Sequence, residues 1–237
     1  MKTEVVFENK DILVVYKPAG IATQTSKIGE KDVVSELKNY LKGGYVGLIH
    51  RLDQPVEGLL VFAKNSAAAA GLSKQVKAKS LEGDEACFSK DYLAVVLGEP
   101  SEAEGRLENM MVKTPDRMAK LVGDDENNPE AKKAVLKYQT VETIIKDEHK
   151  ISLLRINLET GRFHQIRAQL ANIGCPIIGD RKYGNAQSIK CADELRIRNV
   201  ALCADRLSFV MPNTKNGEVC EYTHKPTGNL FSEFSKC

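Results

Sequence analysis

Asp53 is the residue of this 237-residue chain best placed to do chemistry, because it stands directly before a turn and an apolar run. The stretch from His50 to Lys64 reads HRLDQPVEGLLVFAK, and residues 59–63 predict a buried strand that would hold the aspartate on a rigid support. Burying an unpaired carboxylate is costly. Asp53 therefore implies either a cationic partner or a reaction that uses a fixed carboxylate. Taken alone, an aspartate here is also typical of a structural turn or cap.

Five further segments place polar, aromatic and glycine residues in recognisable patterns. In chain order they are Lys17-Pro18-Ala19-Gly20, Tyr92-Leu93-Ala94-Val95-Val96-Leu97-Gly98, Thr160-Gly161-Arg162-Phe163-His164-Gln165-Ile166-Arg167, Pro176-Ile177-Ile178-Gly179-Asp180-Arg181-Lys182-Tyr183-Gly184 and Leu202-Cys203-Ala204-Asp205-Arg206-Leu207-Ser208-Phe209. Together with the Asp53 segment, they resemble the ordered motifs of the RluA-type pseudouridine synthases. The chain departs from those motifs at Tyr16, where the family usually has Asn, and at Val56-Glu57, where it commonly has Thr-Ser.

The resemblance implies an isomerase that converts uridine in RNA to pseudouridine. Asp53 falls on the position of the family's catalytic aspartate, and a carboxylate can attack an electrophilic carbon of the nucleotide. Desolvation raises the pKa of a carboxyl group, so the aspartate needs a nearby cation to stay ionised, and Arg167 matches the arginine that pairs with it. Tyr92 matches the active-site tyrosine, whose ring would stack on the base and whose hydroxyl could take part in proton transfer.

The same resemblance indicates which residues meet the RNA. A stacked base cannot reach a buried aspartate, so the enzyme is expected to flip the target uridine out. Arg51, Arg162 and His164 are candidate phosphate or base contacts, and Leu202 is a candidate wall of the pocket. His50 is interpreted as a supporting or purely structural histidine. The negative charge at Glu57 is expected to lie near the RNA and to alter its contacts.

Composition limits the other possibilities. No apolar run approaches the roughly 20 residues that span a bilayer, and the N-terminus lacks the features of a signal peptide, so a cytoplasmic protein without membrane association is expected. The six cysteines and four histidines are scattered without ligand-pair spacing, which predicts no metal site, and the main interpretation requires no cofactor. A net charge of +2 does not by itself indicate RNA binding. The family resemblance suggests a monomer.

The expected fold is α+β, a single pseudouridine synthase catalytic domain over residues 1–237, with a central mixed, largely antiparallel sheet flanked by helices and loops. No separate N-terminal RNA-binding domain is expected. Alternating or apolar runs predict strands, and helical spacing predicts helices. The predicted strands are 5–7, 12–16, 59–63 and 92–97, with hairpins over 107–121 and 134–158; the predicted helices are 33–41, 66–79 and 163–173, and residues 123–129 are predicted to be a loop.

The sequence is compatible with two other functions. A non-catalytic RNA-binding or RNA-folding protein could keep the same scaffold. A glycoside hydrolase could also use a carboxylate, but no second acid occurs in a motif beside Asp53. Replacing Asp53 with Asn separates the first alternative from the synthase, because only catalysis requires the carboxylate.

Overall fold

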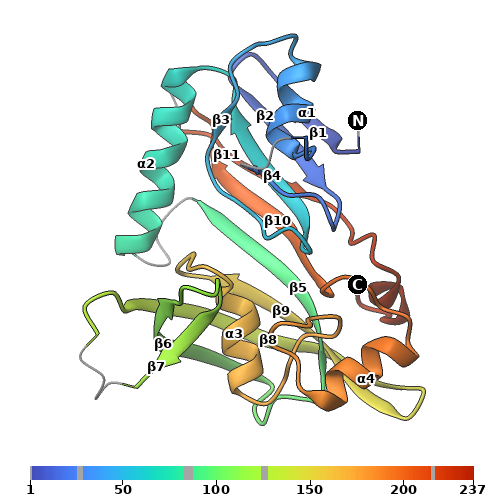
Figure 1. Ribbon diagram of the computed structural model, residues 1–237. Coiled ribbons are helices and arrows are strands. Elements are labelled where there is room, and N and C mark those ends of the chain that lie inside the picture. The colour runs from blue at the N-terminus through green and yellow to red at the C-terminus, as the bar shows by residue number, and fades with distance from the viewer. Residues whose placement is uncertain (1, 26–28, 83–87, 124–127, 215–216) are drawn as a thin grey trace. The chain divides into compact units, whose positions relative to one another are not determined.

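The computed structural model describes residues 2–25, 29–82, 88–123, 128–214 and 217–237. The chain divides into two compact units. The first unit comprises Met1–Lys90 and Cys203–Thr227, and the second comprises Asp91–Leu202 and Gly228–Cys237. Each unit combines a sheet with helices (Figure 1), which confirms the α+β class.

Strands of the first unit form a mixed sheet in the order β1-β2-β4-β10, with β11 beside β10 and β3 beside β4. Among the described strands of this unit, β4 and β10 pair in parallel, whereas the pairs β1–β2, β2–β4, β3–β4 and β10–β11 are antiparallel. The apolar runs of β2 and β4 are buried along their whole length, so these strands form the core. The strand bounds are β1 Glu4–Glu8, β2 Ile12–Lys17, β3 Gly47–Leu48, β4 Glu57–Ala63, β10 Leu202–Val210 and β11 Val219–Thr223.

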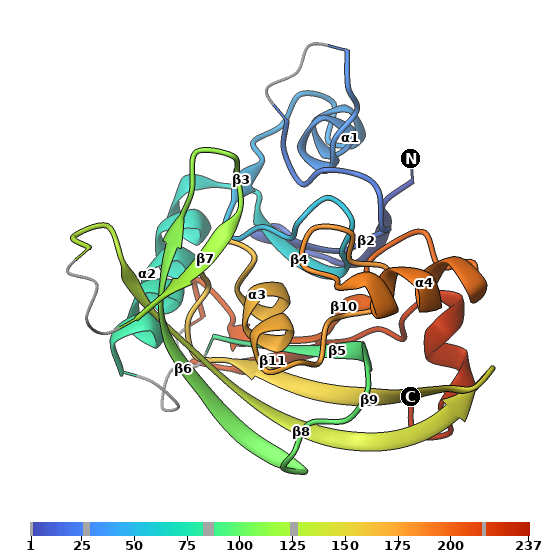
Figure 2. The ribbon, with the colours of Figure 1, turned by 60° about the horizontal axis from the view of Figure 1, so that its bottom comes forward.

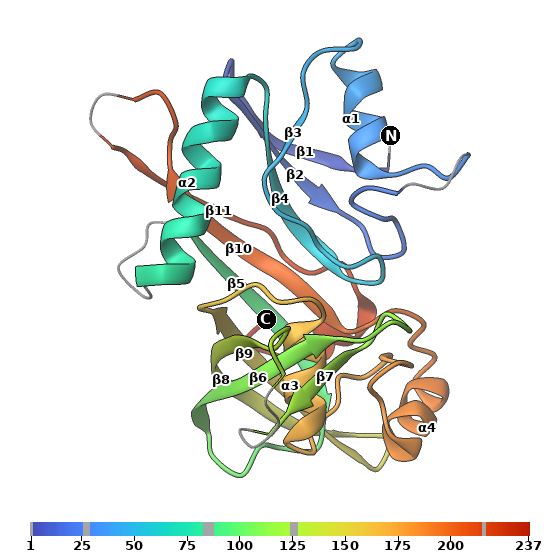
Figure 3. The same cartoon turned by 60° about the vertical axis from the view of Figure 1, so that its left-hand side comes forward.

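Two helices accompany this sheet. Helix α1 (Val33–Tyr40) begins at Asp32, whose side chain accepts from the Ser35 backbone N–H at 2.7 Å. Helix α2 (Ser66–Glu82) runs alongside the sheet (Figure 3). The Gln75 side chain joins α2 to β10, because it accepts from the Val210 N–H at 2.9 Å and donates to the Val210 carbonyl at 2.8 Å.

Strands of the second unit form an antiparallel sheet in the order β5-β9-β8-β6-β7. Helix α3 lies across a face of this curved sheet (Figure 2). The Gln169 side chain fixes it there by donating to the Asn109 side chain at 2.7 Å and to two backbone carbonyls of the sheet. The bounds are β5 Ser89–Leu97, β6 Glu104–Lys113, β7 Ala119–Val122, β8 Lys132–Lys146, β9 His149–Leu158, α3 Gln165–Asn172, α4 Ala186–Glu194 and the 3-10 helix η2 Asn229–Glu233.

Most predicted elements are confirmed, including both hairpins and the mixed, largely antiparallel pairing. Helix α3 begins two residues later than predicted, because His164 adopts a left-handed φ of 51°. Residues 124–127 of the predicted loop lie outside the described residues. Strands β10 and β11 and helix α4 were not predicted. A single domain over 1–237 without a separate N-terminal RNA-binding domain stays a prediction.

Candidate functional site

Asp53 lies in a short loop that is tied to the segment following β2. It is half-buried, and its carbonyl accepts from the Val56 N–H at 3.1 Å, which closes the predicted turn. The Thr23 hydroxyl donates to the Leu52 carbonyl at 2.9 Å and accepts from the Leu52 N–H at 3.1 Å. Leu52, directly before Asp53, is therefore held by two hydrogen bonds, as a positioned carboxylate requires.

Lys17 is a buried cation beneath this loop. Its ammonium donates to the carbonyls of Pro18 at 3.1 Å, Ile21 at 2.8 Å and Gln54 at 3.2 Å. Burial lowers the pKa of Lys17 to about 8, while the charges of Asp53 and Glu57 act to raise it. Asp53 therefore has a cation within its own unit. Lys17 belongs to one of the motifs that resemble the family's, but the sequence assigned it no role beside Asp53.

Glu57 is also buried, which corrects the expectation that its charge meets the RNA. Its side chain is 4% exposed and accepts from the Tyr16 hydroxyl at 2.7 Å and the Thr227 backbone N–H at 3.2 Å. The Thr227 hydroxyl donates to the same carboxylate oxygen. His224 stacks on the Tyr16 ring with centroids 3.8 Å apart. The two departures from the family motifs, at positions 16 and 57, thus contact one another inside the first unit.

His50 has a structural role in the first unit. Its ring is buried, its Nε2 accepts from the Val61 N–H at 3.3 Å, and it packs edge-on against Phe88. Burial holds the pKa of His50 well below its usual value, and the charge of Lys90 acts in the same direction. A neutral imidazole that accepts a backbone hydrogen bond fits support of β4 rather than proton transfer.

Arg167 is buried in the second unit and forms a two-pronged ion pair with Asp180. Its Nε lies 2.7 Å from Oδ2 and its Nη2 lies 2.8 Å from Oδ1 of that carboxylate. The guanidinium also lies 5.1 Å from the ring centroid of Tyr183, whose hydroxyl is 2.8 Å from His164 Nδ1. Asp180 and Tyr183 belong to the motif over residues 176–184, and the sequence predicted no role for either. A buried arginine needs a carboxylate partner. This requirement is the one feature from which a partner such as Asp180 could have been predicted.

The other predicted site residues occupy different environments. Tyr92 on β5 and Leu202 at the start of β10 are buried, and Arg51 is exposed. Arg162 Nε donates to the Lys133 carbonyl at 2.8 Å. Asp53 and Arg51 belong to the first unit; Tyr92, Leu202, Arg162, His164 and Arg167 belong to the second. The meeting of Asp53 with Tyr92 and Arg167 stays a prediction.

Within the described ranges, no helix is long and apolar enough to cross a bilayer.

Comparisons with known proteins agree with the motifs. A family model described as RNA pseudouridylate synthase matches residues 11–172. Ribosomal large subunit pseudouridine synthase C of Rickettsia bellii is 35% identical over 182 residues, which cover 76% of this chain and 56% of that protein. An uncharacterized RNA pseudouridine synthase of Bacillus subtilis is 30% identical over 228 residues, covering 92% of this chain and 67% of that protein. The chain thus spans little more than half the length of the Rickettsia relative.

A solved structure shares the fold. The protein described as human RNA Pseudouridylate Synthase Domain Containing 1 aligns with a TM-score of 0.76 at 21% identity, covering 94% of this chain and 83% of that chain.

Proposed function

The chain belongs to the RNA pseudouridylate synthase family, and we propose that it isomerises specific uridines of ribosomal or transfer RNA to pseudouridine in the cytoplasm, without a metal or redox cofactor. The observation that carries the proposal is the Asp53 loop, whose flanking residues Leu52 and Gln54 are hydrogen-bonded to Thr23 and Lys17. A fixed carboxylate beside a buried cation is suited to nucleophilic attack.

The proposed reaction replaces the bond between the sugar C1′ and N1 of uracil with a bond between C1′ and C5. Asp53 attacks either the sugar C1′ or the uracil ring, and the bond between C1′ and N1 breaks. The detached base rotates, a bond forms between C1′ and C5, and the bond that Asp53 had made breaks, which returns the free carboxylate. The proton on C5 is lost and N1 gains one, so the product is an isomer of the substrate. Lys17 lies close enough to Asp53 for their charges to interact, so a cation accompanies the proposed nucleophile.

Residues of the second unit complete the proposed machinery. Arg167 would pair with Asp53 and favour its ionised form, and Asp180 fixes the orientation of its guanidinium. Tyr92 would stack on the flipped uracil and assist loss of the C5 proton. Arg51, Arg162 and His164 are proposed RNA contacts, and Leu202 is a proposed pocket wall.

Relatives favour ribosomal RNA as the substrate. Several are named ribosomal large subunit pseudouridine synthase C or D. The chain spans only part of the length of these relatives, and ribosomal RNA is the substrate that we propose first for it.

Site-resolved pseudouridine mapping of ribosomal and transfer RNA tests the proposal. RNA is compared from cells with the gene, without it, and with Asp53→Asn, a substitution that keeps the side-chain shape and removes the nucleophile. We expect a uridine that is modified only with the intact gene. Tyr92→Phe serves as a second variant, because it keeps the ring and removes the hydroxyl.

The results of this mapping distinguish a pseudouridine synthase from a non-catalytic RNA-binding protein. Identical maps from all three strains, together with RNA binding by purified wild-type and Asp53→Asn protein, would favour the alternative of a non-catalytic RNA-binding or RNA-folding protein. Modification that survives Asp53→Asn would remove the nucleophile assigned here.

A further inference from the structure

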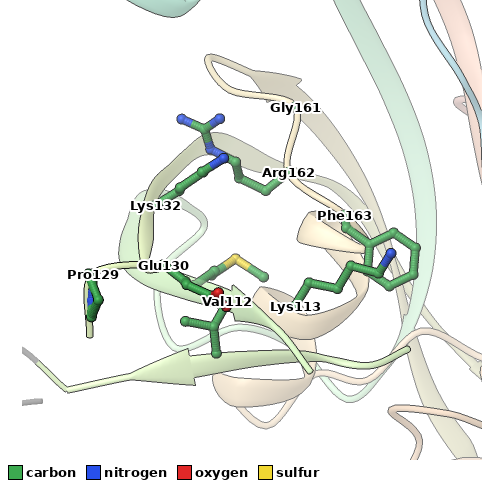
Figure 4. Close-up of a pocket in the computed structure, with 9 residues that line it drawn as sticks. Val112, Lys113, Pro129, Glu130, Lys132, Gly161, Arg162 and Phe163 are labelled. Carbon is green, nitrogen blue, oxygen red and sulfur yellow. The ribbon is translucent and has the colours of Figure 1, made fainter. Parts of the chain in front are cut away.

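A pocket of about 570 Å³ opens in the second unit, among the end of β6, the segment that leads into β8 and the loop that precedes α3. Its lining includes Lys113, Glu130, Lys132, Arg162 and Phe163 (Figure 4). Ligand sites for small molecules commonly have volumes of about 300–1,000 Å³, so the pocket can hold a group the size of a nucleotide.

Positive charge dominates the pocket. Lys113, Lys132 and Arg162 contribute three cations, whereas Glu130 is the one carboxylate among the described lining residues. Lys132 and Arg162 lie together at one end in Figure 4. The hydrogen bond from Arg162 Nε to the Lys133 carbonyl, 2.8 Å long, restricts the guanidinium. This charge balance suits an anion such as a phosphate.

Phe163 presents an aromatic ring to the same pocket. The side chain is 37% exposed, which is unusual for a phenylalanine. The His164 ring stacks on it at 3.7 Å between centroids, and His164 is itself fixed by the Tyr183 hydroxyl. The Lys113 ammonium lies 4.9 Å from the centroid of the Phe163 ring. Because a lysine stem is flexible, this ammonium could move onto a phosphate while a base takes its place on the ring.

We propose that this pocket binds one single-stranded nucleotide of the RNA substrate, with its base stacked on Phe163 and its phosphate held by Lys113, Lys132 and Arg162. The inference rests on the proposed function, because an RNA substrate must be present. Stacking on an aromatic ring tolerates any base, and the site therefore adds affinity without specifying sequence.

A labelled single-stranded octaribonucleotide of mixed sequence, titrated with the full chain by fluorescence anisotropy, tests the proposal. Phe163→Leu removes the aromatic ring and is expected to weaken binding about 5- to 100-fold, whereas Phe163→Tyr retains a ring and should bind as the wild type does. Tyr45→Leu is the matched control, because Tyr45 is another exposed aromatic residue, 49% exposed, in the first unit.

The phosphate contacts are tested through salt dependence. Lys113→Ala and Lys132→Ala should each reduce the slope of log affinity against log salt by about 0.7. Lys190→Ala is the control, because that side chain is 73% exposed on α4. Glu130→Gln should strengthen binding by removing the opposing charge.

The proposal is overturned if Phe163→Leu binds as tightly as the wild type while the wild type still modifies RNA. That result would leave the proposed function intact. A wild type that neither binds the probe nor modifies RNA would overturn both. Thermal unfolding of each variant shows whether it is folded; if Phe163→Leu is unfolded, the salt slopes of the two lysine variants decide.

Discussion

The hydroxyl of Tyr16 donates a 2.7 Å hydrogen bond to the buried carboxylate of Glu57. These residues stand at two positions where the chain departs from its family's motifs. Glu57 also receives the backbone N–H and the hydroxyl of Thr227. The two departures therefore form one buried polar cluster that joins β2, β4 and the segment after β11, and neither residue can be interpreted without the other.

Tyr16→Phe is expected to lower the free energy of unfolding by about 1–3 kcal/mol, because the Glu57 carboxylate loses a donor where water cannot replace it. In a double-mutant cycle with Glu57→Gln, the two effects should differ from additivity by at least about 0.5 kcal/mol. Urea denaturation measures both quantities.

Tyr40→Phe provides the control for that cycle. The Tyr40 hydroxyl also donates to a carboxylate, that of Glu8 at 2.9 Å, but on the surface. We expect little or no change in stability for this variant. Equal losses for Tyr16→Phe and Tyr40→Phe would contradict the role of burial.

Asp180→Asn tests the buried ion pair with Arg167. The substitution leaves the guanidinium buried without its negative partner, so the free energy of unfolding should fall by about 3–5 kcal/mol. Asp193→Asn is the control, because Asp193 pairs with Arg181 while both side chains are more than half exposed. Its effect should be a small fraction of the first, since solvent screens exposed pairs. Similar midpoints in urea for both variants would argue against a tightly buried pair.

Gly58→Ala is expected to lower stability by about 3 kcal/mol or more, because it combines backbone strain with a clash. Gly58 has a φ of 131°, and an added Cβ would lie 2.5 Å from the backbone N and O of Ala204 on the paired strand β10. Gly71→Ala on α2 is the control: its nearest atom is 3.6 Å away, and alanine should stabilise the helix by up to about 1 kcal/mol. A folded, equally stable Gly58→Ala protein would mean that β4 and β10 are spaced more widely than described.

The local pattern of apolar residues was sufficient to predict those strands and helices whose pattern lies within one short segment of the sequence. The run 12–16 predicted β2, and the helical spacing over 33–41 predicted α1. Strand β10 was missed because Cys203, Ala204 and Asp205 give it no clear alternation, and because its parallel partner β4 lies far away in the sequence. The pairing of distant strands depends on tertiary structure and not on propensity.

In the candidate site, too, some residues were predicted from the sequence and others were found only in the structure. Motifs indicated Asp53 and Arg167, but the residues that hold them, Lys17 and Asp180, were recognised only when burial and hydrogen bonds were known. Glu57 was misplaced because an acidic residue is usually exposed, and only its contacts with Tyr16 and Thr227 make its burial tolerable.

Lys17 should make stability depend on alkaline pH. Its pKa is about 8 in the folded chain, where burial disfavours the charged form, against 10.5 as the ordinary value. Between these values the unfolded chain binds the proton more tightly, so the contribution of Lys17 to the free energy of unfolding rises as pH increases. Relative to Lys17→Met, the wild type should gain roughly 2 kcal/mol between about pH 7.5 and pH 10. Urea denaturation at both pH values measures the change, and Lys190→Met, altered at an exposed lysine, should show none. A difference between wild type and Lys17→Met that is constant with pH would show that the buried ammonium keeps its ordinary pKa.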